Sequence, residues 1–222
     1  AGLISGQILS NITGNSTLGY ALIKNKKLLG KINRTDIKRL AKRYIDFPKF
    51  STWSILANTL AYNLTNIFIS TVYSASTLGF YSLGNTAIGM PSSLLGNSAG
   101  QVFFEKANEE RSRTGRAVHT FNSTFRGLLL IAVPTFVILY FVVEDLFAFI
   151  FGEQWRVAGQ YAKIMLPLFF IRFVTAPISN INNIFEKQKI ALAWQLSLLV
   201  ATLVVFYISK TTHFNITNFL YL

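Results

Sequence analysis

One cation lies in a part of the chain where a charge is costly. Arg172 falls within residues 158–183, an apolar stretch long enough to cross a membrane. An arginine at the bilayer centre costs about 2.5–3.5 kcal/mol even on the lenient insertion scale, so its side chain must face protein or water. Helical spacing places small or polar residues on the same face, at Thr175, Ala176, Ser179 and Asn183. A guanidinium in a polar cavity suits a phosphate, which it binds with two parallel hydrogen bonds.

Arg172 also has a purely structural interpretation. Pro167 and Pro177 interrupt the same stretch, and a proline within a helix frees a backbone carbonyl. A nearby arginine can donate to such carbonyls without any ligand. The sequence leaves both interpretations of Arg172 open.

Residues 46–104 form two further membrane-length segments, joined by a short uncharged turn. One helical face of the first segment collects Ser51, Ser54, Asn58, Tyr62, Thr65 and Asn66, and one stripe of the second collects Asn85, Gly89, Ser92, Ser93, Gly96 and Gly100. Polar groups in a bilayer are costly unless they face protein or water, so we expect both faces to turn toward a shared interior, as in a transporter. The candidate cavity residues are Asn58, Tyr62, Asn66, Asn85, Ser92, Arg172, Thr175, Ser179 and Asn183.

The sequence contains no recognisable catalytic motif. P-loop, GxSxG, HExxH and paired-cysteine patterns are absent, and the chain has no cysteine at all. Glu144 and Asp145 could suggest acid–base chemistry, but no nucleophile or positioned partner is near them in the sequence. His119 and His213 lie far apart, close to predicted loops. We therefore predict a protein that is not an enzyme, with no catalytic residue, metal or cofactor.

Composition favours a membrane protein. Apolar residues make up 51% of the 222 residues and charged residues only 14%, about half the charged share of a soluble domain. The net charge of +12 could suggest nucleic-acid binding, but ten of the 21 basic residues lie between Lys24 and Lys49. Basic loops between apolar spans mark the cytoplasmic side, so we expect no nucleic-acid partner.

The apolar stretches predict an all-α integral membrane bundle of about six spans. Besides 46–104 and 158–183, spans are expected over 1–23, 127–143 and 190–208. Basic residues number ten, four and two in the connections 24–49, 105–120 and 186–189, and zero, one and one in 74–79, 144–157 and 209–216. This alternation places 24–49 inside and 144–157 outside. Ile37, Leu40, Ala41, Tyr44 and Ile45 recur at helical spacing among lysines and arginines, which predicts an amphipathic helix on anionic lipid headgroups.

Three segments carry a resemblance to a known family. RYIDFPKFS (43–51), LGFYSLGN (78–85) with MPSSLLGNSAGQVFFEKA (90–107), and FGEQWRVAGQYAKIMLPLFFIRF (151–173) resemble the second half of the polysaccharide-biosynthesis flippases. These belong to the multidrug/oligosaccharidyl-lipid/polysaccharide exporter superfamily. The resemblance implies twelve helices in two six-helix bundles around a central cavity. Residues 1–23 would be the last helix of the first bundle, 24–49 a basic cytoplasmic amphipathic linker, and 50–222 a truncated second bundle whose next helix starts near Asn218.

The resemblance also implies a function. Such proteins move undecaprenyl-pyrophosphate-linked oligosaccharide units from the cytoplasmic to the outer leaflet of the bacterial inner membrane, for O-antigen, capsule or exopolysaccharide synthesis. The implied partners are the lipid-linked oligosaccharide, membrane lipids and the missing N-terminal bundle, with a polysaccharide polymerase and glycosyltransferases as further candidates. The family often has an arginine where this chain has Thr86, which shifts the expected cationic role to Arg172.

Two alternative functions remain. A drug or cation antiporter of the same superfamily would need carboxylates within its spans, and none of the predicted spans has one deep inside. A polytopic polymerase of lipid-linked sugars should have a long outer loop, whereas the longest outer connection here, 144–157, is short.

Overall fold

The computed structural model describes residues 33–212 and 214–221, together with Gly6, Ser10, Thr13, Asn15 and Ser16. The predicted span over 1–23 and residues 24–32 of the predicted linker lie outside the described residues, apart from those five positions, as does His213. The chain divides into two compact units, Ala1–Ile45 and Asp46–Leu222. This boundary falls within the basic stretch 24–49, which therefore contributes residues to both units.

The first unit contains helix α3 (Arg34–Arg43). Asn33 caps it, because its side-chain oxygen accepts the Thr35 N–H at 3.2 Å, and Asp36 pairs with Arg39 at 2.8 Å. None of its residues is buried, and Ile37 and Leu40 are exposed among the basic side chains. The stretch is helical as expected, although the helix ends at Arg43 with Tyr44 as its C-cap, and its contact with lipid headgroups stays a prediction.

The second unit begins with a one-turn π-helix, η1 (Phe47–Ser51), which continues directly into α4 (Thr52–Val72). Pro48 lies in the first turn of η1, where backbone N–H groups have no hydrogen-bond partner within the helix. The N–H that proline lacks is therefore not needed at this position. The turn residues that precede this helical stretch are Tyr44 and Ile45. Pro48 therefore starts the helical stretch rather than interrupting it.

Helix α5 (Ala75–Thr114) is the longest described helix, with 40 residues. Ser74 caps its start by accepting the Thr77 N–H at 3.0 Å, and Gly115, at φ 73°, ends it in the left-handed conformation that glycine adopts easily. The charged stretch 105–116, expected to be a connection, is mostly the last turns of this helix. The Glu110 carboxylate accepts the backbone N–H groups of the next helix's first turn, from His119 at 3.0 Å and Thr120 at 2.7 Å.

Helices α6 (Val118–Phe151) and α7 (Arg156–Ile178), linked by the short 3₁₀ turn η2 (Glu153–Trp155), form the most extensive helix pair. Both pass through prolines without ending: Pro134 lies within α6, and Pro167 within α7. The expectation that Pro167 breaks its span was wrong, because neighbouring packing holds the helix through the lost hydrogen bond. Only Pro177, one residue before the end of α7, coincides with a terminus.

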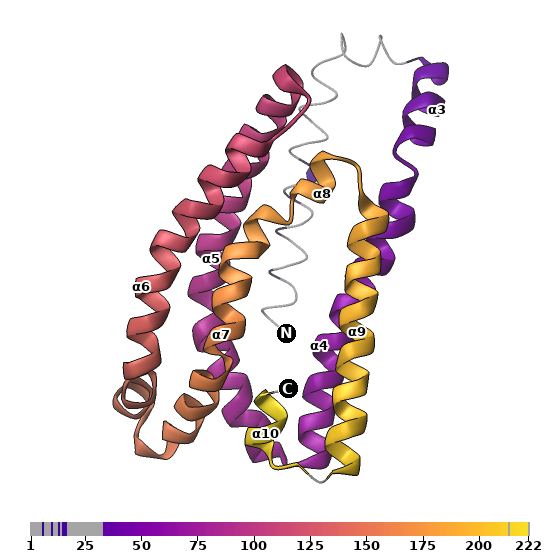
Figure 1. Cartoon of the computed structure of the whole chain (residues 1–222). Helices are drawn as coiled ribbons and strands as arrows, with labels where there is room; N and C mark the ends of the chain where they lie inside the picture. The colour runs from indigo at the N-terminus through magenta and orange to yellow at the C-terminus, as the bar shows by residue number, and fades with distance from the viewer. Residues whose placement is uncertain are drawn as a thin grey trace. The chain divides into compact units, whose positions relative to one another are not determined.

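After α7 the chain forms α8 (Ile181–Ile184), α9 (Gln188–Thr211) and α10 (Ile216–Tyr221). Within this unit α7 packs against both α5 and α6, whereas α4 packs mainly against α9 (Figure 1). The first group contains the main apolar core, with Phe103, Phe147 and Phe169 among its buried side chains. The second pair is joined by the stacked rings of Phe68 and Phe206, whose centroids are 4.4 Å apart.

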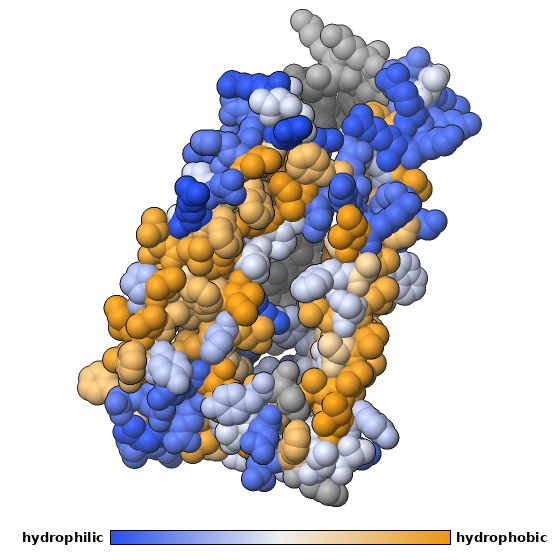
Figure 2. Space-filling view, viewed as in Figure 1, coloured by the Kyte–Doolittle hydropathy of each residue, from blue (hydrophilic) through white to orange (hydrophobic). Residues whose placement is uncertain are grey.

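Among the described residues, three helical segments are long and apolar enough to cross a membrane: Val118–Phe151, Glu153–Ile184 and Gln188–Thr211. Over α6, apolar side chains fill the middle of the helix and polar ones gather at its ends (Figure 2), and Phe149 is 89% exposed. Apolar side chains left uncovered along a whole helix are typical of a surface that faces lipid. Helices α4 and α5 are long enough, but their Asn, Ser, Thr and Gly residues lower their mean hydropathy. Every described element is a helix, as the sequence predicted.

Candidate functional site

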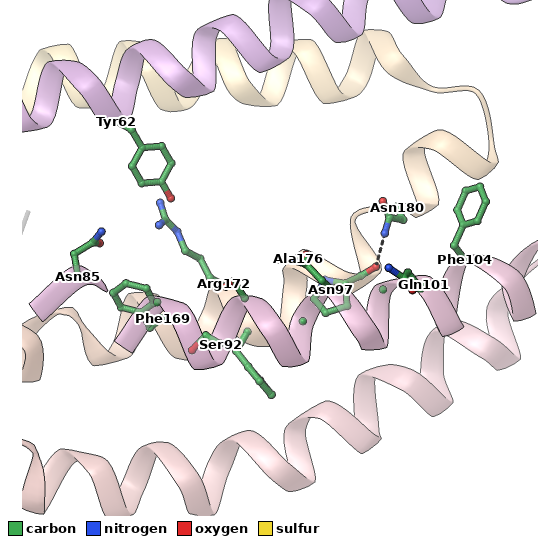
Figure 3. Close-up of a pocket in the computed structure, with 16 residues that line it drawn as sticks. Tyr62, Asn85, Ser92, Asn97, Gln101, Phe104, Phe169, Arg172, Ala176 and Asn180 are labelled. Atoms are coloured by element: carbon green, nitrogen blue, oxygen red, sulfur yellow. Dashed lines mark hydrogen bonds between the residues drawn. The ribbon is translucent and has the colours of Figure 1, made fainter. Parts of the chain in front are cut away.

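A cavity of about 780 Å³ lies between α4, α5 and α7 of the second unit (Figure 3). Helix α5 supplies one wall through residues that recur every three or four positions, so that they share a helical face. Helix α7 and its C-terminal end supply another wall, and Tyr62 comes from α4. The lining residues are Tyr62, Asn85, Gly89, Ser92, Ser93, Gly96, Asn97, Gly100, Gln101, Phe104, Phe169, Arg172, Phe173, Ala176, Pro177 and Asn180.

Arg172 is the charged residue of this lining. Its side chain extends from α7 across the cavity, and its guanidinium carbon lies 4.9 Å from the centre of the Tyr62 ring on α4 (Figure 3). This cation–π contact attracts the guanidinium toward the ring without neutralising its charge. With the other described residues, Arg172 makes no hydrogen bond or salt bridge. No described carbonyl near Pro167 or Pro177 accepts from it, so the proline-based structural role finds no support in these contacts.

The other polar lining groups are neutral. Asn85, Asn97 and Gln101 offer amide donors and acceptors, which suit the hydroxyl groups of a polar ligand. Ser92 donates to the Ile88 carbonyl of its own helix at 3.0 Å, and the Asn180 amide donates to the Pro177 carbonyl at 3.4 Å. No acidic side chain is found among the described lining residues. The cavity therefore combines one positive charge with uncharged hydrogen-bonding groups.

The structure brings together four of the nine predicted site residues. Tyr62, Asn85, Ser92 and Arg172 line the cavity. The other five do not line it. Asn58 and Asn66 belong to α4. Thr175 is exposed on α7, Ser179 is the exposed C-cap of α7, and Asn183 is exposed on α8. The hydroxyls of Thr175 and Ser179 donate to carbonyls of their own helix, at 2.8 Å in each case. The polar face predicted beside Arg172 therefore reaches the cavity only at Ala176, four residues on.

Sequence reasoning missed three polar lining residues, Asn97, Gln101 and Asn180. The first two continue the four-residue spacing of Asn85, Gly89 and Ser93, so extending that stripe by two helical turns would have identified them. Asn180 follows the end of α7, where helical spacing gives no guide to the direction of a side chain.

The carboxylates at the C-terminal end of α6 are paired with cations. Glu144 forms a 2.7 Å salt bridge with Lys163 of α7. Asp145 pairs with Arg156 at 2.6 Å. Both carboxylates therefore have cationic partners within the same pair of helices. Within the described part of the chain, no three His, Cys, Asp or Glu side chains gather in a group that could hold a metal ion.

Comparison with known proteins gives one match. The model of a family described as polysaccharide biosynthesis protein matches residues 2–160. The match includes the lining residues Tyr62, Asn85 and Ser92, whereas Arg172 lies beyond it. It confirms the resemblance to a polysaccharide biosynthesis family, while the assignment to the C-terminal half of a flippase stays a prediction. No curated protein and no solved structure matches the chain.

Proposed function

Because this chain belongs to the polysaccharide biosynthesis protein family, we propose that it forms part of a flippase for lipid-linked oligosaccharides. The proposed substrate is an undecaprenyl-pyrophosphate-linked oligosaccharide unit, moved from the cytoplasmic to the outer leaflet of a bacterial inner membrane. The product would supply O-antigen, capsule or a related exopolysaccharide. In this proposal residues 50–222 belong to the second of two bundles in a multi-pass protein of about twelve helices.

The observation that carries the proposal is the cavity around Arg172. Of the described residues around it, Arg172 alone is charged, and its neighbours are amides, hydroxyls and glycines. A pyrophosphate needs a cation with several directed donors, and a guanidinium offers five N–H groups in a fixed fork. Sugar hydroxyls need neutral donors and acceptors, which Asn85, Asn97 and Gln101 supply. The pyrophosphate of the proposed substrate therefore matches Arg172, and its sugars match the neutral amides of the lining.

The arrangement of α4 and α5 supports a transport role. Helix α5 turns its polar stripe toward the cavity, and α4 reaches the same cavity through Tyr62 (Figure 3). A fixed anchor would have no need of such faces, whereas a pathway through the membrane requires them. The antiporter alternative would use free carboxylates, but Glu144 and Asp145 are both occupied by cations.

Substitution of Arg172 tests the proposal. We expect Arg172→Lys to keep the charge but lose the paired geometry, and Arg172→Ala to lose both. One charge-assisted hydrogen bond contributes about 1.5–3 kcal/mol, so Arg172→Lys should reduce transport roughly tenfold and Arg172→Ala by about a hundredfold or more. The assay is leaflet-to-leaflet transfer of a labelled polyprenyl-pyrophosphate oligosaccharide in proteoliposomes of the complete native protein, normalised to folded protein.

Arg126 provides a matched control, since it is an exposed arginine at the start of the apolar part of α6 and does not line the cavity. Arg126→Ala should leave transport unchanged. Normal transport per folded molecule in Arg172→Ala would refute the proposed role of the cavity. A loss of folded protein with unchanged transport per molecule would instead assign Arg172 a structural role.

A further inference from the structure

A second hollow, of about 300 Å³, lies between α5 and α6. It exists because α7 packs extensively against both of these helices, whereas α5 and α6 contact each other much less. The two helices are thus held apart along part of their length, and Phe173 of α7 lines the space between them. Pro91 and Leu95 of α5 and a row of apolar residues on α6 complete the lining. We call this hollow the α5–α6 groove.

The α5–α6 groove extends along α6, while its wall on α5 is shorter, from Ala87 to Leu95. Its residues on α6 begin at Ile131 and end at Phe151. Twenty residues of helix rise about 30 Å at 1.5 Å each, which equals the thickness of the hydrocarbon layer of a membrane. A compact ligand would use only a small part of such a groove, whereas an extended hydrocarbon chain would use all of it.

The lining of the groove is chemically uniform. Its two hydroxyl groups both donate to carbonyls of their own helices, Ser92 to Ile88 at 3.0 Å and Thr135 to Ile131 at 2.8 Å. The remaining lining residues are aliphatic or aromatic. Both hydroxyl donors of the lining are therefore already hydrogen-bonded within the protein, so the groove favours a purely apolar occupant.

The groove and the Arg172 cavity share two lining residues. Ser92 of α5 and Phe173 of α7 line both spaces. A molecule with an anionic, polar head and a long apolar tail could therefore place its head beside Arg172 and its tail between α5 and α6. A polyprenyl pyrophosphate carrying sugars has both parts, and its sugars match the neutral amides of the cavity, which the smaller head of an anionic phospholipid would leave without partners.

We infer that the α5–α6 groove binds the polyprenyl chain of the substrate while its head occupies the Arg172 cavity. This inference rests on the proposed function, since the substrate is the one proposed there. It assigns the tail a defined place on the protein, in contrast to free movement among the surrounding lipids. The groove would then recognise the lipid by the length and flexibility of its isoprenoid chain.

Photo-crosslinking tests the inference. The complete native protein is placed in phosphatidylethanolamine–phosphatidylglycerol vesicles with a polyprenyl pyrophosphate that carries a diazirine in its terminal isoprene units. Parallel vesicles contain a phospholipid with a diazirine in its acyl chain. Ile131→Trp narrows the groove, and Ile138→Trp is its matched control, because both isoleucines lie on α6 with similar exposure, 55% and 61%, but only Ile131 lines the groove.

We expect the polyprenyl probe to label the groove side of α6 and the phospholipid probe to label its whole lipid-facing surface. Ile131→Trp should reduce polyprenyl labelling by about fourfold for each methylene displaced from the groove, and Ile138→Trp should leave it unchanged. Binding of a short-chain isoprenoid pyrophosphate, which has a head but almost no tail, should be equal in both variants. That equality shows that Ile131→Trp has folded and that its cavity is intact.

Two results would overturn the inference without affecting the proposed function. One is equal labelling of the groove by the phospholipid probe, which would make it an ordinary lipid contact. The other is unchanged polyprenyl labelling in Ile131→Trp while the short-chain compound still binds in an Arg172-dependent way. If neither isoprenoid compound binds at all, the proposed function fails and the groove assignment fails with it.

Discussion

Replacing Gly159 with alanine tests how closely α6 and α7 pack, and this pair positions Arg172. A Cβ atom added at Gly159 would lie 2.8 Å from the Glu144 Cα, 3.1 Å from the Phe147 Cβ and 3.2 Å from the Glu144 carbonyl oxygen. The first of these distances is shorter than Cβ atoms in real proteins show, so α6 would have to move. Two of the three atoms belong to the α6 backbone, which cannot rotate away as a side chain can.

Two opposing effects set the size of the change. Alanine is a better helix former than glycine by about 1 kcal/mol. Overpacking typically costs about 1–3 kcal/mol, and a clash with backbone places this site at the upper end of that range. The net loss should therefore be about 2 kcal/mol, which lowers the Tm of a 222-residue chain by about 4–8 °C and that of a longer protein by less.

Gly127 of α6 provides the control, because a Cβ atom added there would meet nothing within 4 Å. Gly127→Ala gains the helix preference alone and should raise the Tm by about 2–4 °C. The measurement is thermal unfolding of the purified complete protein in detergent micelles, followed by circular dichroism. If Gly159→Ala raises the Tm as Gly127→Ala does, the close approach of α6 and α7 at this point is refuted.

Two further predictions concern charged groups outside the cavity. Glu144→Gln should lower thermal stability more than the double change Glu144→Gln with Lys163→Met, because the single change leaves a partly buried ammonium without its partner; equal losses would contradict this. Hydrogen bonds from the Thr120 side chain and backbone, and from the His119 N–H, lower the pKa of Glu110. Its stabilising effect is therefore present above the ordinary carboxyl pKa of about 4.3 and is lost as pH falls through the lower folded value. Hydrogen exchange at the backbone amides of His119 and Thr120 should be faster in Glu110→Ala than in wild type. This difference should disappear when the pH falls below the folded pKa of Glu110. The control variant Glu109→Ala should exchange these two amides at the wild-type rate.

The sequence predicted the helical class and the order of the main helices of the second unit, but not where they end. Charged residues suggested that a span stopped near Phe104, whereas α5 continues to Thr114. Hydropathy locates the part of a helix that lies in an apolar medium, while the helix itself ends where a capping geometry is available. Gly115 supplies that geometry for α5 and Gly152, at φ 99°, ends α6. A prediction of membrane spans from hydropathy therefore cannot locate helix ends that lie beyond the apolar region.

The site was predicted unevenly for a related reason. On α5 the polar stripe is long and regular, and both residues predicted from it, Asn85 and Ser92, line the cavity. On α7 the residues at +3 and +7 from Arg172 are polar but exposed, and the cavity uses the +4 and +8 positions, Ala176 and Asn180. Arg172 alone identifies one residue of α7 that faces the cavity. It does not show whether the cavity extends toward the residues at +3 and +7 or toward those at +4 and +8. That direction depends on where α5 and α4 lie, which is tertiary information.

The same residues explain why α4 and α5 escape recognition by apolarity and why they form the cavity. Asn85, Ser93, Asn97 and Gln101 each lower the mean hydropathy of α5, and each lines the space that Arg172 enters. In a membrane such residues are tolerated only where they face protein or water, so a helix that is too polar to be a simple span must have a polar space beside it. Of the three segments that are apolar enough to cross a membrane, Val118–Phe151 and Gln188–Thr211 contribute no described residue to the cavity lining, whereas Glu153–Ile184 contributes Arg172 and part of the cavity wall. The cavity of the proposed function is therefore formed by one strongly apolar segment, which carries Arg172, and by two helices, α4 and α5, whose polar residues weaken their membrane signal.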